Sequence, residues 1–600
     1  MRVGCVEGTG RIAGWPSKAA ARNGSRRLNG AAIVLGISVS ALLFVAGAEA
    51  QQVNQPGFDP RQTERYLDEQ QRRSAQPVPP RPRAPQFAPQ GGGGDVKPLF
   101  TLRAVALTGA SALPADQLAS AYQPYLGKPV SQADLAAIAT AISDQYRAAG
   151  YHLSRAIVPP QDISNGRVRI QVIEGSITEV SLKGTGAEEF GVRPMLDPVL
   201  AESPSRLTTL ERQLLLINSR GGVRLVDSSL EEIGGTTGRF RLVIELQTWH
   251  VYGFAGVDNL GSSTVGPWQS YATAAFNSYL LPGDTLTTNL STTPGDPRQL
   301  AFGRLAYEVP VGTDGAYVGG SALYSEVRPG DIRRRFNDNT VTETYELRGG
   351  ITPIQSQRAS LRLNLAAAFS EVTERDVFGV WYRDHIRTLT ATADYRWKDD
   401  LGGDSYLTLA YKQGLNVLGA TRAGDPLASR DTASPTFSVV NGWFTRYQTL
   451  SDAWSLKLAA AGQLASGPLY NSQQFYLGGF AYGRGYGSAE ISGDNGVAGT
   501  FEVRFEQKPD WTYLKSYQLY SFFDAGLAWN DGFRPSDGVA LTSAGGGVRF
   551  TFPNDWRADL GVAFPLSYRA PDNSTRGARL LLSLSSVLKL CPQRGQGPCI

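Results

Sequence analysis

Cysteine and histidine are scarce in this 600-residue sequence, and their scarcity excludes several kinds of site. The three histidines are His152, His250 and His385. They are scattered, and no cluster has the spacing of metal ligands, so we expect no metal or other cofactor. Of the three cysteines, Cys5 lies near the start, whereas Cys591 and Cys599 lie close together in the segment CPQRGQGPCI. In an exported protein these two form either a small disulfide loop, which we favour, or two free thiols.

Long apolar runs are also missing, with one exception, which argues against a helical membrane protein. The exception, residues 31–47, follows basic residues at positions 22, 26 and 27 and precedes the tripeptide Ala-Glu-Ala at 48–50. A charged, an apolar and a small-residue region in this order predict a secretory signal peptide over residues 1–50. A single transmembrane anchor is the alternative, but the run is short for a membrane span.

The chain carries no net charge once this leader is set aside. The whole sequence has 58 basic and 54 acidic residues, and the first 50 residues hold six basic and two acidic ones, which leaves 52 of each. The basic pI of about 8.8 therefore reflects the leader and gives no reason to expect nucleic acid as a partner. The sequence also lacks a phosphate-binding Gly-x-x-x-x-Gly-Lys-Ser/Thr loop and a nucleophile elbow, which argues against an enzyme.

The first part of the exported chain predicts a helix on a tether. The segment DPRQTERYLDEQQRR is rich in helix formers, with Asp59 as the N-cap and Pro60 in the first turn, so we expect a short helix within residues 51–75. Proline and glycine dominate residues 76–98, which are typical of a linker. A tethered helix suggests a mobile element that docks elsewhere in the protein.

Residues 99–248 predict two copies of one α+β unit. In residues 99–175, the strand FTLRAVALTG is followed by two helices and the strands HLSRAIVPPQ and GRVRIQVIEG. Ser131 and Asp134 have the spacing of a capping box at the second helix. The same β-α-α-β-β order recurs in residues 176–248, from the strand ITEVSLKGTG to the strand RFRLVIELQ. This recurrence indicates a tandem repeat.

Strict alternation of apolar and polar residues begins at residue 249. In TFEVRFEQ, residues 500–507, three apolar side chains alternate with three charged ones. Sixteen such segments begin near residues 250, 269, 284, 298, 315, 340, 358, 386, 404, 435, 453, 497, 517, 540, 556 and 576. An even number of strands of about ten residues each, after a signal peptide, predicts an outer-membrane β-barrel over residues 249–590. A soluble β-sandwich is the alternative, but it has far fewer strands.

One glycine-rich stretch, GGFAYGRGYGSAEISGDNG at residues 478–496, contains seven glycines and a single arginine, Arg484. It joins the eleventh and twelfth segments, so it is the sixth outer loop if the first strand starts in the periplasm. An open sixteen-stranded barrel would leak, because its lumen is wide enough for water. We therefore expect the loop to fold inward and Arg484 to dock on a carboxylate. A flexible outer loop is the alternative.

The candidate partner of Arg484 lies in the segment FFDAG, residues 522–526. Because Phe523 and Ala525 are expected to face lipid, alternation directs Asp524 into the lumen. Gly526 on the same face leaves space for the loop.

These stretches resemble the two-partner secretion transporters of the outer membrane (TpsB type), of the haemolysin-activator and filamentous-haemagglutinin-transporter kind. Arg484, Gly485 and Tyr486 match the Arg-Gly-Tyr core of that family's sixth-loop signature, and Phe522, Asp524 and Gly526 match its barrel-wall motif Phe-x-Asp-x-Gly. VIEGSITEVSLKG and LERQLLLINSRGGV resemble the hinge and the second copy of its paired POTRA domains. The resemblance extends from about residue 53 to residue 590.

The resemblance implies a mainly β fold with an α+β periplasmic part. The expected order is a plug helix (51–75), a linker (76–98), POTRA 1 (99–175), POTRA 2 (176–248), a 16-stranded antiparallel transmembrane β-barrel (249–590) and a C-terminal tail (591–600). It implies a location in the Gram-negative outer membrane, with the POTRA domains in the periplasm.

The implied function is export of one large, unfolded partner protein, recognised by the POTRA domains, without ATP (type Vb secretion). Outer-membrane lipid, periplasmic chaperones and the barrel-assembly machinery are further expected partners, and a monomer is expected. The resemblance implies no catalytic residue and no cofactor. An outer-membrane assembly or insertion factor of the same superfamily is the alternative, although such proteins typically carry more periplasmic repeats. A passive porin would lack the tandem domains.

Two positions depart from the family pattern. Gly483 stands before the Arg-Gly-Tyr core, where the family usually has a branched apolar residue, and we expect it to loosen the loop tip. Residues 591–600 follow Leu590, a position that often holds a terminal aromatic residue in the family, so the end that the assembly machinery reads departs from the family pattern.

Overall fold

The structure is a computed structural model that describes residues 97–163, 165–184, 186–235, 238–532, 534–567 and 577–590. The predicted signal peptide, the plug helix, nearly all of the linker and the tail with Cys591 and Cys599 lie outside these ranges. None of the helices in the described ranges is long and apolar enough to cross a membrane.

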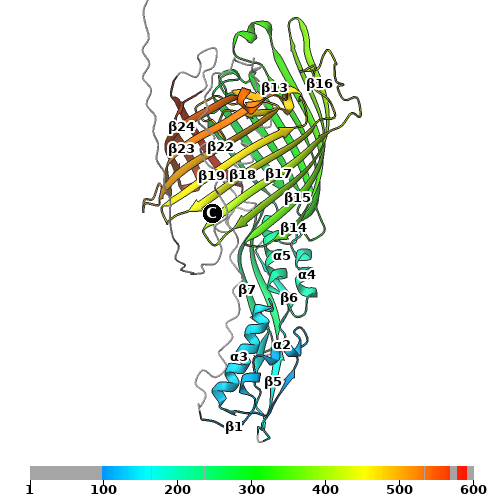
Figure 1. Cartoon of the computed structure of the whole chain (residues 1–600), viewed down its shortest axis with the longest axis vertical. Coiled ribbons are helices and arrows are strands. Elements are labelled where there is room, and N and C mark those ends of the chain that lie inside the picture. Colours follow the sequence, from blue (N-terminus) through cyan, green and yellow to red (C-terminus); the bar gives the residue numbers. More distant parts are fainter. Residues whose placement is uncertain are drawn as a thin grey trace, which may run out of the picture. The chain divides into compact units, whose positions relative to one another are not determined.

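The first α+β unit has a three-stranded sheet with the strand order β2-β5-β4, and the short strands β1 and β3 pair separately. Its elements are β1 (Phe100–Thr101), β2 (Ala104–Thr108), α2 (Ala115–Ala119), β3 (Pro129–Val130), α3 (Gln132–Ala148), β4 (Arg155–Ile157) and β5 (Arg167–Ile173) (Figure 1). Leu118 of α2 and Ile138 of α3 pack against Val168 and Ile170 of β5 in one buried core. The helices therefore cover one face of the sheet.

The capping box predicted for α3 is confirmed. The backbone N–H of Asp134 donates to the Ser131 hydroxyl at 3.2 Å, and the N–H of Ser131 donates to the Asp134 carboxylate at 2.8 Å. The first strand, however, was predicted as one continuous segment and is two. The N–H of Leu102 bonds to Lys128, whereas that of Arg103 bonds to Gly166, so the backbone changes partners between two sheets.

The second α+β unit repeats this arrangement, with the strand order β6-β8-β7. Its elements are β6 (Ser176–Lys183), α4 (Asp197–Ala201), α5 (Leu207–Ser219), β7 (Val223–Glu232) and β8 (Arg239–Thr248). In this unit β6 pairs in parallel with the last strand, β8, just as β2 pairs in parallel with the last strand of the first unit, β5. Leu210 and Leu214 of α5 are buried together with Leu242 and Ile244 of β8, so this unit has a core of its own.

Sixteen antiparallel strands close the barrel, in chain order, as predicted. They are β9 (Val251–Asp258), β10 (Gln269–Asn277), β11 (Thr285–Thr292), β12 (Leu300–Val311), β13 (Ala316–Val327), β14 (Asn339–Gln355), β15 (Ala359–Asp376), β16 (Gly379–Lys398), β17 (Gly403–Gly414), β18 (Ser438–Thr449), β19 (Trp454–Ala465), β22 (Asn495–Gln507), β23 (Ser516–Trp529), β24 (Val539–Thr551), β25 (Trp556–Pro565) and β26 (Arg579–Leu590). Closure is made by β26, which pairs with β9 from Ser583↔Asp258 to Leu590↔Val251. Short 3-10 turns lie at Gln123–Tyr125, Arg193–Leu196, Ile332–Phe336, Asn471–Gln473, Pro535–Asp537 and Pro553–Asp555.

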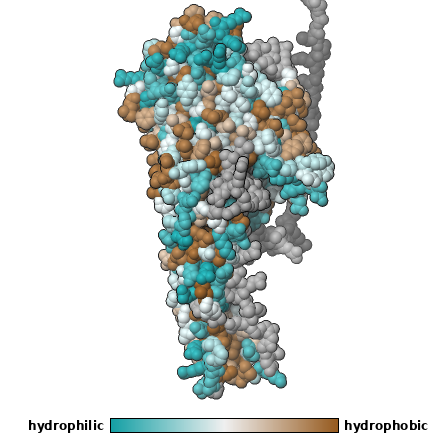
Figure 2. All heavy atoms as spheres, turned by 180° about the vertical axis from the view of Figure 1, so that it is seen from behind, coloured by the Kyte–Doolittle hydropathy of each residue, from teal (hydrophilic) through white to brown (hydrophobic). Residues whose placement is uncertain are grey.

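The two faces of the barrel strands differ as the alternation predicts. Large apolar side chains are exposed on the outer face, among them Leu290, Leu305, Leu347, Leu365, Leu409, Phe501, Phe523 and Leu560. In Figure 2, apolar side chains spread over the strands on the face that is seen there. A soluble domain would bury such residues, whereas a lipid-facing barrel exposes them to hydrocarbon.

Three strands are much longer than the ten or so residues predicted. β14, β15 and β16 have 17, 18 and 20 residues, whereas about 9–11 tilted residues cross a bilayer. Toward the outer end of β14, the next outward-facing residue after Tyr345 is Glu343, and on β15 the next one after Phe369 is Glu371. The outward face thus changes there from aromatic to charged. These strands therefore continue past the aromatic boundary of the membrane on the outer side.

Candidate functional site

The loop between β19 and β22, residues 466–494, is called loop 6 below. It contains a 3-10 turn and a small hairpin of β20 (Phe475–Leu477) and β21 (Ile491–Gly493). The predicted bounds, 478–496, were therefore wrong at both ends: the loop starts earlier, and Asn495 and Gly496 already belong to β22. The error arose because the hairpin strands have only three residues each and carry no alternation long enough to read.

Loop 6 folds inward onto the barrel wall. Leu477 and Ile491 of its hairpin and Tyr486 of its tip are buried against Ala528 of β23 and Leu541 of β24. These contacts lie on the face of β23 that is opposite to the exposed Phe523. The loop therefore occupies the lumen, as expected.

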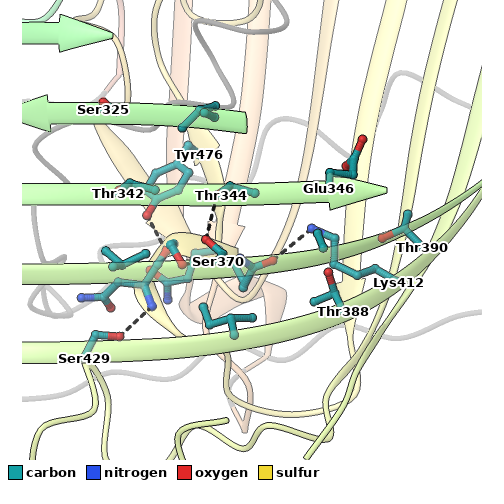
Figure 3. Close-up of a pocket in the computed structure, with 18 of the residues that line it drawn as sticks. Ser325, Thr342, Thr344, Glu346, Ser370, Thr388, Thr390, Lys412, Ser429 and Tyr476 are labelled. Carbon is teal, nitrogen blue, oxygen red and sulfur yellow. Dashed lines mark hydrogen bonds between the residues drawn. The ribbon is translucent and has the colours of Figure 1, made fainter. Parts of the chain in front are cut away.

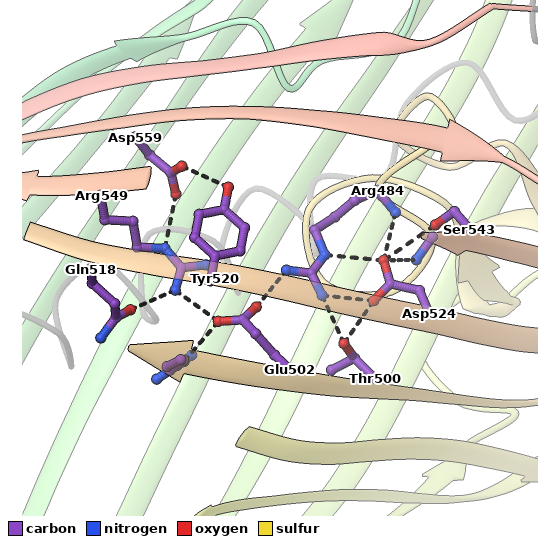
Figure 4. Close-up of polar contacts among 11 residues, drawn as sticks. Arg484, Thr500, Glu502, Gln518, Tyr520, Asp524, Ser543, Arg549 and Asp559 are labelled. Atoms are coloured by element: carbon purple, nitrogen blue, oxygen red, sulfur yellow. Dashed lines mark hydrogen bonds and ion pairs between the residues drawn. The ribbon is translucent and has the colours of Figure 1, made fainter. Parts of the chain in front are cut away.

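The ion pair expected between Arg484 and Asp524 is present (Figure 4). The Arg484 Nε and Nη2 atoms donate to the two Asp524 carboxylate oxygens at 3.0 and 2.8 Å. The backbone N–H groups of Gly483 and Arg484 add bonds of 3.2 and 2.9 Å to the same carboxylate. Arg484 is 8% exposed and Asp524 is 0% exposed, so water competes little with this forked pair.

Arg484 has two further partners on β22. Its Nη1 atom donates to Glu502 at 2.6 Å, and its Nη2 atom donates to the Thr500 hydroxyl at 2.8 Å. Thr500 in turn donates to Asp524 at 2.6 Å, directly across the strand pair. The guanidinium thus meets two carboxylates and a hydroxyl, and the loop tip is fixed by its side chain as well as its backbone.

The other motif residues lie where loop 6 and the barrel wall come into close contact. The guanidinium carbon of Arg484 lies over the Phe522 ring, and a Cβ atom at Gly526 would lie 2.9 Å from Leu477 of the loop hairpin. A Cβ atom at Gly485 would lie 2.8 Å from the backbone nitrogen of Pro565. Both glycines therefore allow the loop to touch the wall.

Tyr486 anchors the far side of the tip. It is 1% exposed, and its hydroxyl donates to the carbonyl of Thr542 at 3.0 Å. The Arg579 guanidinium, from the last strand, donates to the Tyr486 carbonyl. Gly483 adopts the left-handed conformation, with φ of 91°, which a branched residue would adopt with strain. Because its N–H also binds Asp524, the structure gives no support for the expectation that Gly483 loosens the tip.

A wider network continues along the wall beyond the predicted residues. Glu502 also accepts bonds of 2.7 Å from Arg504 and Arg549, and Arg549 pairs with Asp559 at 3.0 Å (Figure 4). Sequence reasoning missed this network, although alternation in TFEVRFEQ already put Glu502 on the polar face. The missing information was the register, which places Glu502 opposite Phe522 and beside the docked arginine.

A second buried carboxylate, Asp494, fixes the outer end of loop 6. It is 0% exposed and pairs with Arg430 in the loop between β17 and β18. It also accepts from the backbone N–H groups of Leu469 and Asp531 at 3.1 and 3.0 Å. Three loops of the outer side therefore meet at one carboxylate.

The described residues hold no group of three or more histidine, cysteine, aspartate or glutamate side chains suited to a metal ion. The plug helix and the cysteine pair lie outside the described residues, so their roles remain predictions from the sequence.

The chain forms a lipid-facing sixteen-stranded barrel that follows two β-α-α-β-β units and holds loop 6 in its lumen. These features define an outer-membrane protein of the POTRA-and-barrel class. The chain belongs to the haemolysin secretion/activation protein family ShlB/FhaC/HecB, which matches residues 241–550. A ShlB-type POTRA domain matches residues 100–175. The chain is thus a two-partner secretion transporter of the outer membrane, and family membership favours this reading over an assembly factor.

Individual relatives agree with the family match. The heme/hemopexin transporter protein HuxB of Haemophilus influenzae strain 86-028NP is 25% identical over 75% of this chain and 80% of its own length. The outer membrane transporter CdiB of Escherichia coli is 23% identical over 86% of this chain and 87% of its own length. The solved structure of CdiB from Escherichia coli, 20% identical, covers 88% of this chain and 98% of its own, with a TM-score of 0.69, so the two share the fold.

Proposed function

We propose that this transporter captures one large, unfolded exoprotein in the periplasm and passes it through the barrel, with loop 6 as a fixed wall of the conduit. The observation that carries the proposal is the docking of Arg484 on Asp524 and Glu502 inside the lumen. A buried ion pair that loses one partner leaves an uncompensated charge, which destabilises the docked loop strongly.

The two α+β units are the proposed capture sites. Each three-stranded sheet ends in two edge strands, β2 and β4 in the first unit and β6 and β7 in the second. An edge strand can bind an extended chain through backbone hydrogen bonds, so recognition needs little sequence specificity. We propose residues 176–248 as a second POTRA domain on the basis of the repeated element order and strand pairing.

The remaining parts of the proposal come from the sequence. The helix within residues 51–75 is proposed to close the resting pore and to leave on its tether when cargo arrives. No nucleotide-binding loop was found, and folding of the cargo outside the cell is the proposed source of free energy. The cargo is proposed to be a single exoprotein; a haem-scavenging protein is one candidate, because one relative is named a heme/hemopexin transporter.

Deleting the gene and comparing the proteins in the medium tests the proposal. We expect one large protein to disappear from the medium, to return with the wild-type gene, and to stay absent with Arg484→Ala. Heat-modifiable migration of the barrel checks that the variant inserts. Loss of many outer-membrane proteins, with the medium unchanged, would instead favour an assembly factor. Normal secretion by an inserted Arg484→Ala barrel would refute the role of the loop.

A further inference from the structure

The hairpin of β15 and β16 carries exposed apolar side chains at its outer tip. Val377 and Phe378, in the turn, are 56% and 78% exposed, and Trp381, near the start of β16, is 62% exposed. Phe336, from the outer loop before β14, is 43% exposed, and its ring centre lies 6.1 Å from that of Phe378. We call these four residues the tip surface.

Lipid explains the other exposed apolar side chains of the barrel wall but not the tip surface. On β15 the outward face changes from aromatic to charged between Phe369 and Glu371. The strand continues from Phe369 to Asp376, which is about 23 Å along its length. The tip surface therefore lies in water beyond the membrane, where an exposed apolar patch marks a site of interaction.

Hydrogen bonds fix the shape of the tip surface. Within the turn, the backbone N–H of Phe378 donates to the Asp376 carboxylate at 2.7 Å. The N–H of Val377 donates to the carbonyl of Phe336 at 2.9 Å, so the outer loop before β14 is joined to the hairpin. The apolar side chains are thus presented by an ordered backbone, and a partner that binds them does not have to order it first.

A cavity of about 980 Å³ lies inside the barrel, lined by loop 6 and by the strands β12 to β19 (Figure 3). Some of its lining residues belong to the outer loop before β14 and to the outer ends of β15 and β16; they are Pro329, Arg333, Glu374, Trp381 and Tyr382. Trp381 thus belongs both to the lining of the cavity and to the tip surface.

Trp381 owes this position to a β-bulge. The pairing of β15 with β16 steps from Glu374↔Tyr382 to Arg375↔Val380, so Trp381 is the extra residue on β16. A bulge bends the strand locally and changes the direction of its side chains. The tip surface is therefore continuous with the lumen through one large aromatic side chain.

We propose that the tip surface binds the exported polypeptide on the outer side of the membrane, as it leaves the lumen. The inference rests on the proposed export function and adds an extracellular binding site to it. The exported chain is the partner because Trp381 joins the tip surface to the cavity inside the transporter. An unfolded chain presents apolar side chains that no fold has yet buried. Burial of such side chains against aromatic rings is favourable and depends little on their exact sequence.

Binding at the tip surface gives export a direction before the cargo folds. A chain in the lumen moves in both directions by diffusion, and no nucleotide-binding loop was found that would drive it. A site that binds only the segment already outside shifts the equilibrium toward the exported state. The tip surface thus acts in the interval between the exit of a segment and its folding.

Photo-cross-linking on intact cells tests the site. The photoreactive amino acid p-benzoylphenylalanine is placed in the full-length chain at position 378 or 381. The control is position 566, because Leu566 is an exposed apolar residue that follows β25, on the opposite side of the barrel. The probe is the protein that disappears from the medium of the deletion strain, detected during its secretion. We expect cross-links to this protein at positions 378 and 381 and at least tenfold fewer at position 566.

The cross-linked product separates the possible occupants. Products that contain a second transporter chain or lipopolysaccharide, without the exported protein, would overturn the proposal, as would equal cross-linking at position 566. No cross-link from a transporter that still secretes would overturn the binding site and leave export intact. If deletion of the gene removes no protein from the medium, export is refuted and this inference with it.

A second test measures the rate of secretion. The double variant Phe378→Ser, Trp381→Ser removes two exposed rings, and we expect secretion to slow at least threefold while heat-modifiable migration shows a folded barrel. Phe378→Leu, Trp381→Leu keeps an apolar surface and is expected to secrete faster than the serine variant. Leu566→Ser is the matched control and is expected to leave the rate unchanged. Secretion at the normal rate from the folded serine variant would contradict the inference.

Discussion

The guanidinium carbon of Arg484 lies 3.5 Å from the centre of the Phe522 ring. The same guanidinium forms an ion pair with Asp524, which lies two residues after Phe522 on β23. The arginine is therefore held by a ring face and by an ion pair supplied by one strand. Since Phe522, Asp524 and Gly526 share a strand face, the motif forms a single receptor for the loop tip.

This arrangement predicts a graded series of loop-6 variants. Arg484→Ala leaves the buried Asp524 without its cation, whereas Glu502 keeps Arg504 and Arg549, so we expect the docked loop to lose about 3–5 kcal/mol. Phe522→Leu keeps a large apolar side chain in the cluster with Tyr520, Ala563 and Leu581 but removes the ring face and its cation–π contact, worth about 0.5–2 kcal/mol. Limited proteolysis of loop 6 in intact cells and the rate of secretion measure both effects. A Phe522→Leu protein as defective as Arg484→Ala would contradict this partition.

A methyl group at Gly526 is expected to push the loop hairpin away from the wall. The new Cβ atom would lie 2.9 Å from a Leu477 methyl group and 3.3 Å from the Val497 carbonyl. Overpacking of this kind costs about 1–3 kcal/mol, so Gly526→Ala is expected to raise protease cleavage of loop 6. Gly303→Ala is the matched control, because its Cβ atom would meet nothing nearer than 3.7 Å. Equal cleavage in the two variants would show that close approach at Gly526 does not matter.

Asp494 predicts a mechanical link among the outer loops. Arg430→Ala removes the cation from a carboxylate that is 0% exposed, and we expect the contacts of Leu469 and Asp531 with it to weaken together. The docking of the outer loops is expected to lose about 3 kcal/mol. Hydrogen exchange should therefore increase in residues 466–477 and near 531 as well as around 430. Faster exchange confined to the loop that carries Arg430 would argue against the link.

The stability of residues 97–248 is expected to fall between pH 6.5 and pH 4. Burial lowers the pKa of His152 from 6.5 to about 4. Between these two pH values His152 is protonated in the unfolded chain and neutral in the folded chain. The contribution of His152 to the free energy of unfolding is fully present above pH 6.5. It decreases by up to about 3 kcal/mol as the pH falls to 4. Thermal unfolding of this fragment, which holds both α+β cores, measures the change.

The control for this prediction is His152→Leu, which cannot titrate. Burial raises the pKa of Glu174, but hydrogen bonds from Ser111, Ala112 and Tyr146 outweigh it and hold the pKa below its ordinary value. This carboxylate also loses its contribution as the pH falls, so a slope remains in the variant. A slope in His152→Leu as steep as in the wild type would assign the effect to the carboxylates alone.

Alternation made most of the barrel predictable from the sequence. In SFFDAGLAW, the exposed Phe523 and the buried Asp524 lie on the faces that their positions imply, because a strand reverses its side-chain direction at every residue. Local capping was equally readable at Ser131, since the two capping bonds span only three residues. Both predictions rest on chemistry within one element.

Features that depend on pairing between elements were not readable. Glu502 meets Arg484 only because register sets β22 against β23 and loop 6 returns over both. The break between β1 and β2 depends on bonds to Lys128 and Gly166, which are remote in sequence. The extension of β16 to 20 residues depends on its pairing with β15, which continues out to Asp376 and Gly379, beyond the part of the strand in which apolar residues face outward.

The two faces of loop 6 have different freedom to change in evolution. Substitutions on the Arg484 side must fit contacts with the barrel wall, such as those of Arg484 with Glu502 and of Tyr486 with Thr542, whereas Tyr476 and Ser492 lie on the open side, which lines a cavity in the lumen. Lineages that acquire a new exoprotein can therefore adapt the open side by single substitutions, while the docked side drifts only through paired ones. Specialisation for cargo and preservation of the scaffold are thus separated within one loop of 29 residues, from position 466 to 494.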